Sequence, residues 1–211
     1  MASRRKTKPT DRSKLDATPP WETRVRDEPQ PTTGPYDERD APADDVARVD
    51  LGALLVPVAP GIDLRLDVNE VKQVIGVTMV IPNGHMQVGV FAAPRNEGIW
   101  DDIRPEIVES VKSQKGVLKE RAGGPFGVEL VGTVRGDGGM VPVRFIGVDG
   151  PRWFLRGMLV GAVAEDAAKA APLLDVLRQT VVVRGKDPLP VRDPVPLRLP
   201  KDLAPDEAAS S

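Results

Sequence analysis

Apolar and polar residues alternate along much of the middle of the chain, with the two-residue period of a half-buried strand. In the segment 62–68, for example, Asp63, Arg65 and Asp67 alternate with aliphatic residues. Short apolar segments separated by Pro, Gly and Asn predict strands at about 54–58, 62–68, 71–81, 85–92, 117–121, 126–135, 140–148, 152–163 and 180–183. The middle of the chain is therefore predicted to be rich in β-structure.

Two other segments have the longer period of an amphipathic helix. The first covers about 98–114 and begins with acidic residues, which favour the helix dipole, and the second covers about 166–179. Because the predicted strands are joined by short connections, their pairing should be mostly antiparallel. The fold class predicted is α+β: a mostly antiparallel twisted sheet of about seven to nine strands with two packed helices.

The two ends of the chain differ in composition from its middle. Residues 1–48 contain seven prolines and 20 charged side chains but few large apolar ones. Such a segment buries too little apolar surface to offset the entropy of ordering, so we predict a disordered tail. A single domain is predicted over residues 49–185, and residues 201–211 are predicted to be a disordered C-terminus.

The segment 186–200 differs from both tails, because valines and leucines alternate there with prolines and polar residues. This pattern is typical of an extended, polyproline-like strap on the surface of a domain. We expect the strap to pack through Leu197 and Leu199.

The overall composition excludes several classes of chemistry. The chain of 211 residues has no cysteine and one histidine, which excludes disulfide scaffolds, thiolate zinc sites, iron–sulfur clusters and multi-histidine metal sites. The net charge of −2 is not the basic footprint of a protein that coats nucleic acid. We therefore expect no cofactor and no metal.

The longest uncharged segment, residues 73–94, is interrupted by the turn sequence Pro-Asn-Gly-His at 82–85. It predicts two strands joined by a hairpin rather than a membrane-spanning helix, which needs an unbroken apolar segment. The first residues lack the apolar segment of a secretory signal, so we expect no such signal.

No arrangement of residues is typical of catalysis. His85 follows an Asn-Gly pair and is interpreted as a turn residue, since a general base needs an orienting partner. The glycines within 132–139 precede a predicted strand rather than a helix, which favours a hairpin turn over a phosphate-binding loop. Carboxylate pairs such as Glu165–Asp166 lie at predicted helix N-termini, where capping explains them. We therefore expect that the protein is not an enzyme.

The segment 147–157 combines arginines with aromatic residues. Arg152, Phe154 and Arg156 share one face of a predicted strand, because side chains two residues apart point the same way. They form the candidate binding face, suited to an anionic or aromatic ligand. The alternative is a structural hairpin whose arginines pair with carboxylates of the domain itself.

The same segment predicts a hairpin turn centred on Asp149–Gly150. In that register Phe145 would lie opposite Phe154, and Ile146 would lie opposite Trp153. Ile146 and Trp153 should then face the core, with the arginines at or near the surface on the opposite face.

The N-terminal tail offers two further binding features. Residues 4–14 are basic and could contact nucleic acid or anionic lipid through charge alone, although a solvated tail is the favoured interpretation. Trp21 and Tyr36 are isolated aromatic residues in this tail, and we treat them as candidate docking anchors for a partner or for the domain itself.

Several longer phrases of the sequence are distinctive: GPYDERDAP (34–42), VDLGALLVPV (49–58), FAAPRNEGIWDDIRPEI (91–107), GPFGVELVG (124–132), VPVRFIGVDGPRWFLRG (141–157) and VVVRGKDPLPVRDPVPLRLP (181–200). In these phrases the chain resembles an actinobacterial family of conserved proteins named only as a domain of unknown function. The resemblance implies a cytoplasmic actinobacterial protein and supplies no activity, cofactor or catalytic residue. The element order also resembles the PsbP/Mog1-like fold, an analogy that implies little about function.

These patterns favour a non-enzymatic binding or scaffold module with a protein partner. Two alternatives remain: a domain that binds a small apolar ligand, and a nucleic-acid-associated factor that uses the basic segment 4–14.

Overall fold

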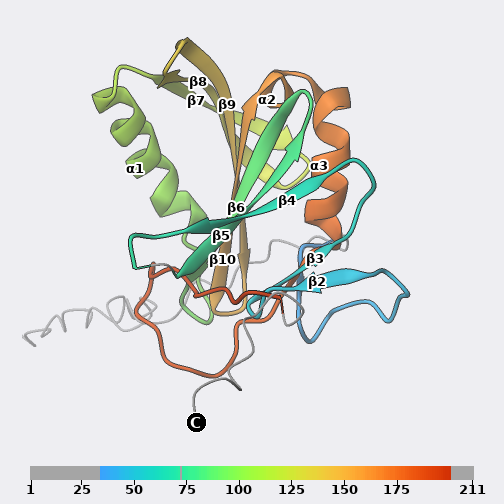
Figure 1. Cartoon of the computed structure of the whole chain (residues 1–211). Helices are drawn as coiled ribbons and strands as arrows, with labels where there is room; N and C mark the ends of the chain where they lie inside the picture. The colour runs from blue at the N-terminus through green and yellow to red at the C-terminus, as the bar shows by residue number, and fades with distance from the viewer. Residues whose placement is uncertain (1–33, 72, 201–211) are drawn as a thin grey trace, which may run out of the picture.

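The structure, a computed structural model, describes residues 34–71 and 73–200 (Figure 1). The predicted tail residues 1–33, with the basic segment 4–14 and Trp21, and the predicted C-terminal tail 201–211 lie outside the described residues. The described residues form a seven-stranded antiparallel sheet, a four-stranded mixed sheet and three helices, which confirms the predicted α+β class.

The large sheet consists of two meanders that pair with each other at its centre. Its spatial order is β4 (Asp63–Val68), β5 (Val74–Ile81), β6 (Gly84–Ala92), β10 (Trp153–Gly161), β9 (Gly139–Gly150), β8 (Gly127–Gly136) and β7 (Val117–Gly124). Strand β10 pairs with β9 through a hairpin and with β6 over a long separation in sequence. The central pair β6–β10 therefore unites the two halves of the sheet.

Some of the strands predicted for one sheet instead belong to a second, smaller sheet. Its order is β1 (Tyr36–Asp37), β11 (Val181–Val182), β3 (Leu54–Pro57) and β2 (Arg48–Asp50). The predicted boundary at residue 48 also differs from the structure, because β1 precedes it and is part of the fold. Asp37 is buried there, and its Oδ2 accepts a hydrogen bond of 2.9 Å from Nε1 of Trp153.

Helices cover both faces of the large sheet (Figure 1). The helices are α1 (Trp100–Ser113), α2 (Ala162–Glu165) and α3 (Ala167–Gln179). Helices α1 and α3 correspond to the two predicted ones, and α2 is a short addition that follows a positive φ at Gly161. The larger core lies between the sheet, α2, α3 and the small sheet, and a smaller core lies beneath α1.

Strand β10 contributes to both cores. Trp153 faces the larger core and Phe154 the smaller one, and each side chain is only 1% exposed. The prediction that Trp153 and Ile146 face the core is confirmed. Phe154, which shares the opposite face of this strand with Arg156, is covered by α1 and belongs to the smaller core.

The predicted turn of the β9–β10 hairpin is also wrong. The turn is formed by Pro151 and Arg152, and Trp153 pairs with Gly150. Proline fixes a negative φ and Arg152 has a φ of +65°, which is the pattern of a type II turn. The sequence Asp-Gly at 149–150 therefore belongs to the strand and not to the turn.

The change of turn also changes the pairing between the strands. Phe154 lies opposite Asp149 rather than Phe145, and Ile146 lies opposite Gly157 rather than Trp153.

The strap fills a gap in the large sheet. Strands β5 and β6 pair only between Val77–Val88 and Ile81–Gly84. Beyond that point the strap pairs with both of them: Val195 N donates to Val90 O at 2.8 Å, and Leu197 N donates to Val74 O at 2.9 Å.

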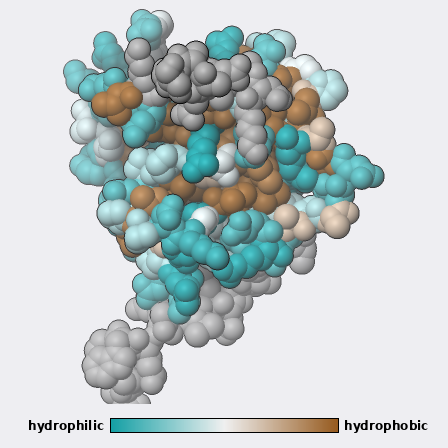
Figure 2. Space-filling model, turned by 60° about the horizontal axis from the view of Figure 1, so that its bottom comes forward, coloured by the Kyte–Doolittle hydropathy of each residue, from teal (hydrophilic) through white to brown (hydrophobic). Residues whose placement is uncertain are grey.

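The strap also contributes apolar side chains to the larger core. Leu197 is 5% exposed, which confirms its predicted packing, whereas Leu199 is 44% exposed and its predicted packing is wrong. Leu199 follows the last backbone hydrogen bond of the strap, from Arg198 N to Leu51 O. The face that carries the strap and the small sheet shows apolar side chains gathered in a band between hydrophilic ones (Figure 2).

The uncharged segment 73–94 forms the β5–β6 hairpin, as predicted. Within the described ranges, no helix is long and apolar enough to cross a membrane.

We predict that Leu197→Ala lowers the free energy of unfolding by about 2–4 kcal/mol, because it removes buried methyl groups from the larger core. Val191→Ala is a matched control on the same strap, since Val191 is 50% exposed. It should cost less than about 1 kcal/mol. Chemical denaturation measures both values, and equally small losses would show that the strap adds nothing to the core.

Candidate functional site

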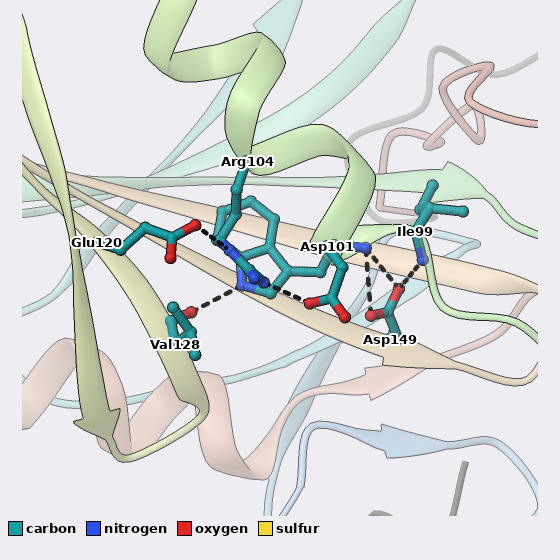
Figure 3. A network of polar contacts seen from close by, with 7 residues as sticks. Ile99, Asp101, Arg104, Glu120, Val128 and Asp149 are labelled. Atoms are coloured by element: carbon teal, nitrogen blue, oxygen red, sulfur yellow. Dashed lines mark hydrogen bonds and ion pairs between the residues drawn. The ribbon is translucent and has the colours of Figure 1, made fainter.

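Helix α1 is fixed over the sheet by a short segment of β9, Gly147–Gly150. Asp149 Oδ1 accepts hydrogen bonds from the backbone N–H groups of Ile99, at 2.7 Å, and Trp100, at 3.3 Å (Figure 3). These donors begin the helix and have no partner inside it. A carboxylate from a neighbouring strand therefore caps α1, and its charge favours the positive end of the helix dipole.

The Trp100 side chain holds the same end of the helix against the sheet. Its ring lies directly over Gly147, where a Cβ atom would come within 2.2 Å of the ring. The indole also stacks on Phe154 with ring centroids 5.7 Å apart, and its Nε1 donates to Val128 O at 2.7 Å. Only glycine fits at position 147 while the tryptophan keeps this place.

Arg104 covers the outer side of Trp100. Its Cζ lies 5.6 Å from the centre of the Trp100 ring. Nη1 of Arg104 pairs with Asp101 at 2.6 Å and Nε pairs with Glu120 at 2.9 Å, which links α1 to β7 (Figure 3). The start of α1 is thus held by a cap, a stacked ring and an ion-pair bridge.

Beside this helix, a groove of about 560 Å³ lies between α1 and the sheet. Its apolar lining comes from three strands and from one face of the helix, and includes Phe91, Phe145, Phe154, Met158, Ile103 and Ile107. The volume and the aromatic lining are typical of sites for small molecules.

An ion pair between the helix and the strap is part of the groove lining. Arg192 Nη1 lies 2.8 Å from Glu106 Oε1, and both side chains are about half exposed. Both residues line the groove. An exposed pair of this kind contributes little to stability.

Arg156 brings a positive charge into the apolar lining. Its neighbours in register are Gly89 on β6 and Gly147 on β9, neither of which has a side chain to cover it. The guanidinium Cζ lies 5.1 Å from the centre of the Phe91 ring. Burial lowers the pKa of the Arg156 guanidinium, and no carboxylate of the described residues forms an ion pair with it.

Arg144, another arginine of the large sheet, has a different environment. Its Nη2 and Nε donate to the two carboxylate oxygens of Glu129 at 2.6 and 2.9 Å, and both side chains are buried. This bidentate pair is the usual way in which a protein interior accommodates a guanidinium. Unlike Arg144, Arg156 has no carboxylate partner among the described residues.

The structure separates the three residues of the predicted binding face. Phe154 and Arg156 both line the groove. Arg152 lies in the hairpin turn, where Arg184 Nε donates to its carbonyl at 3.1 Å and its own Nη1 reaches Gly185 O at 3.4 Å. The positive φ of Arg152 removes it from the alternation of the strand.

Tyr36 and His85 do not line the groove. Tyr36, one of the two candidate docking anchors, is half-buried in β1, and its N–H donates to Thr180 O at 2.9 Å. Its backbone is thus part of the domain itself. His85, interpreted as a turn residue, lies instead on β6 opposite Val160.

The sequence analysis did not predict that one face of α1 forms a wall of the groove. The apolar residues of α1, including Ile103 and Ile107, were recognisable from their period, but nothing local showed which strands they face. Gly89 carried no signal either, because its role depends on its register opposite Arg156.

The family model described as "Protein of unknown function (DUF3710)" matches residues 34–206. No curated protein and no solved structure matches the chain. The matched region includes every residue of the groove, and the PsbP/Mog1-like analogy stays a prediction.

We predict that Gly147→Ala lowers the free energy of unfolding by about 1–3 kcal/mol, because the new methyl group overlaps the Trp100 ring. The near-ultraviolet circular dichroism of the tryptophans should change as well. Gly138→Ala is the control, since a Cβ atom there has no neighbour within 4 Å. Equal stability of the two variants would contradict the packing of the Trp100 ring against Gly147 of β9.

Proposed function

Since the chain belongs to the DUF3710 family of proteins of unknown function, we propose a function from its groove: a non-enzymatic module that binds a small, mainly apolar molecule. The observation that carries the proposal is the groove of about 560 Å³ with three phenylalanines in its lining. Burial of an apolar ligand against such a surface is favourable in proportion to the area removed from water.

The construction of the groove supports binding. One wall is helix α1, whose first turn is held by Asp149 and Trp100, and the floor is the centre of the large sheet. Walls that are already in place reduce the ordering cost that a ligand must overcome.

The polar groups of the groove favour binding over catalysis. Of the described residues that line it, the one carboxylate is Glu106, which is paired with Arg192, and the one hydroxyl is that of Ser110. A nucleophilic hydroxyl needs a base within hydrogen-bonding reach, and Glu106 is engaged elsewhere. We therefore propose a binding role without a chemical step.

The resemblance of the sequence supports a cytoplasmic, actinobacterial setting for this module. The nucleic-acid hypothesis rests on residues 4–14, which lie outside the described part of the chain, and the groove bears on neither that hypothesis nor the protein-scaffold one.

We predict that uncharged N-phenyl-1-naphthylamine binds the wild-type protein saturably, with an increase in its fluorescence. Gly89→Val should weaken this binding at least about tenfold, because its methyl groups would occupy the floor of the groove. A Cβ atom at position 89 would lie 3.4 Å from Phe91, an ordinary contact, so the variant should fold.

Gly138→Val is the matched control, because it adds the same side chain at a turn where a Cβ atom has no neighbour within 4 Å. It should bind the dye as the wild type does. Absence of saturable binding by the wild type, or equal binding by both variants, would contradict the proposed function.

A further inference from the structure

The charges that line the groove are unbalanced. Glu106 and Arg192 neutralise each other, with 2.8 Å between Arg192 Nη1 and Glu106 Oε1. Arg156 is the remaining charged residue of the lining, and within the described residues its guanidinium has no ion-pair partner. The lining therefore has an excess of one positive charge, which a ligand with a single negative charge would neutralise.

The surroundings of Arg156 leave space for such an anion. Of the two glycines beside it in register, Gly147 is covered by the Trp100 ring. Gly89 is not covered in this way, since a Cβ atom there would have its nearest neighbour, Phe91, at 3.4 Å. An anion can therefore approach the guanidinium over Gly89, on the side of the groove.

The identity of the cation favours a carboxylate. A guanidinium presents a planar fork of N–H donors that matches the two oxygens of a carboxylate. The contact with Phe91, 5.1 Å from Cζ to the ring centre, orients this fork. In a partly buried site, such charge-assisted hydrogen bonds are stronger than in water.

The rest of the ligand is defined by the apolar lining. Phe91 and Phe154 lie with their ring centroids 6.1 Å apart, and Ile103 and Ile107 lie across from them on α1. This surface suits a flat apolar body, because aromatic rings pack favourably in offset or tilted arrangements. The groove volume of about 560 Å³ is in the range of sites that hold a small molecule, which favours such a ligand over a helix or strand of another protein.

We propose that the groove binds an aromatic monocarboxylate, with the carboxylate held by Arg156 and the ring packed between Phe91 and α1. This inference rests on the proposed function and adds the chemical class of the ligand.

The test compares 2-naphthoate with 2-naphthamide, a neutral molecule of nearly the same shape, by isothermal titration calorimetry. The wild type should bind the carboxylate at least about tenfold more tightly, since a hydrogen bond to a charged group is at stake. Arg156→Gln should bind both compounds with similar affinity, and Arg156→Lys should recover part of the preference because it restores the charge without the fork.

Arg135→Gln is the matched control, because Arg135 is an exposed arginine on β8 that does not line the groove. It should keep the full preference for naphthoate. Unchanged affinity of Arg156→Gln for N-phenyl-1-naphthylamine would show that the groove of the variant is intact.

The outcomes separate the two proposals. If the wild type binds both naphthalene compounds equally, or if Arg156→Gln keeps the preference, the carboxylate inference is overturned while the binding function stands. If neither the dye nor the naphthalene compounds bind the wild type, the proposed function itself fails.

Discussion

The position of helix α1 depends on a steric constraint in β9. At Gly147 and Gly150 there is no room for side chains, because the rings of Trp100 and Trp153 occupy those places, with 2.2 and 2.1 Å from an ideal Cβ atom to the nearest ring atoms. Between the two glycines, Asp149 caps the helix. The four-residue segment Gly147–Gly150 thus packs against one tryptophan on each face of the sheet. It also fixes the position of α1, which forms one wall of the groove.

The ligand class that we propose for the groove follows from the electrostatics of the large sheet. Arg144 pairs with the buried carboxylate of Glu129, which also pairs with Arg121 at 2.8 Å. Arg156 has lost part of its hydration, and within residues 34–71 and 73–200 its guanidinium gains a contact with the Phe91 ring in return. Leaving a partly buried charge without a carboxylate costs stability, and a bound anion would offset that cost.

Local patterns in the sequence predicted the α+β class, the two longer helices and the strands of the large sheet. They failed at the β9–β10 hairpin, where Asp149–Gly150 resembles a turn but serves to cap α1 and to seat Trp153. Pro151 and the positive φ of Arg152 form the turn instead. The groove could not be predicted, because it depends on the distant pairing of β6 with β10, through which Gly89 lies beside Arg156.

The central claim is that an aromatic carboxylate binds between α1 and the β6–β10 pair. The most direct measurement is a titration of the ¹⁵N-labelled protein with 2-naphthoate, followed by amide chemical shifts in NMR spectra. We predict saturable shifts in Gly84–Ala92, Trp153–Gly161 and Trp100–Ser113, with smaller ones in the small sheet. Shifts confined to the small sheet, or none at saturating naphthoate, would contradict the claim.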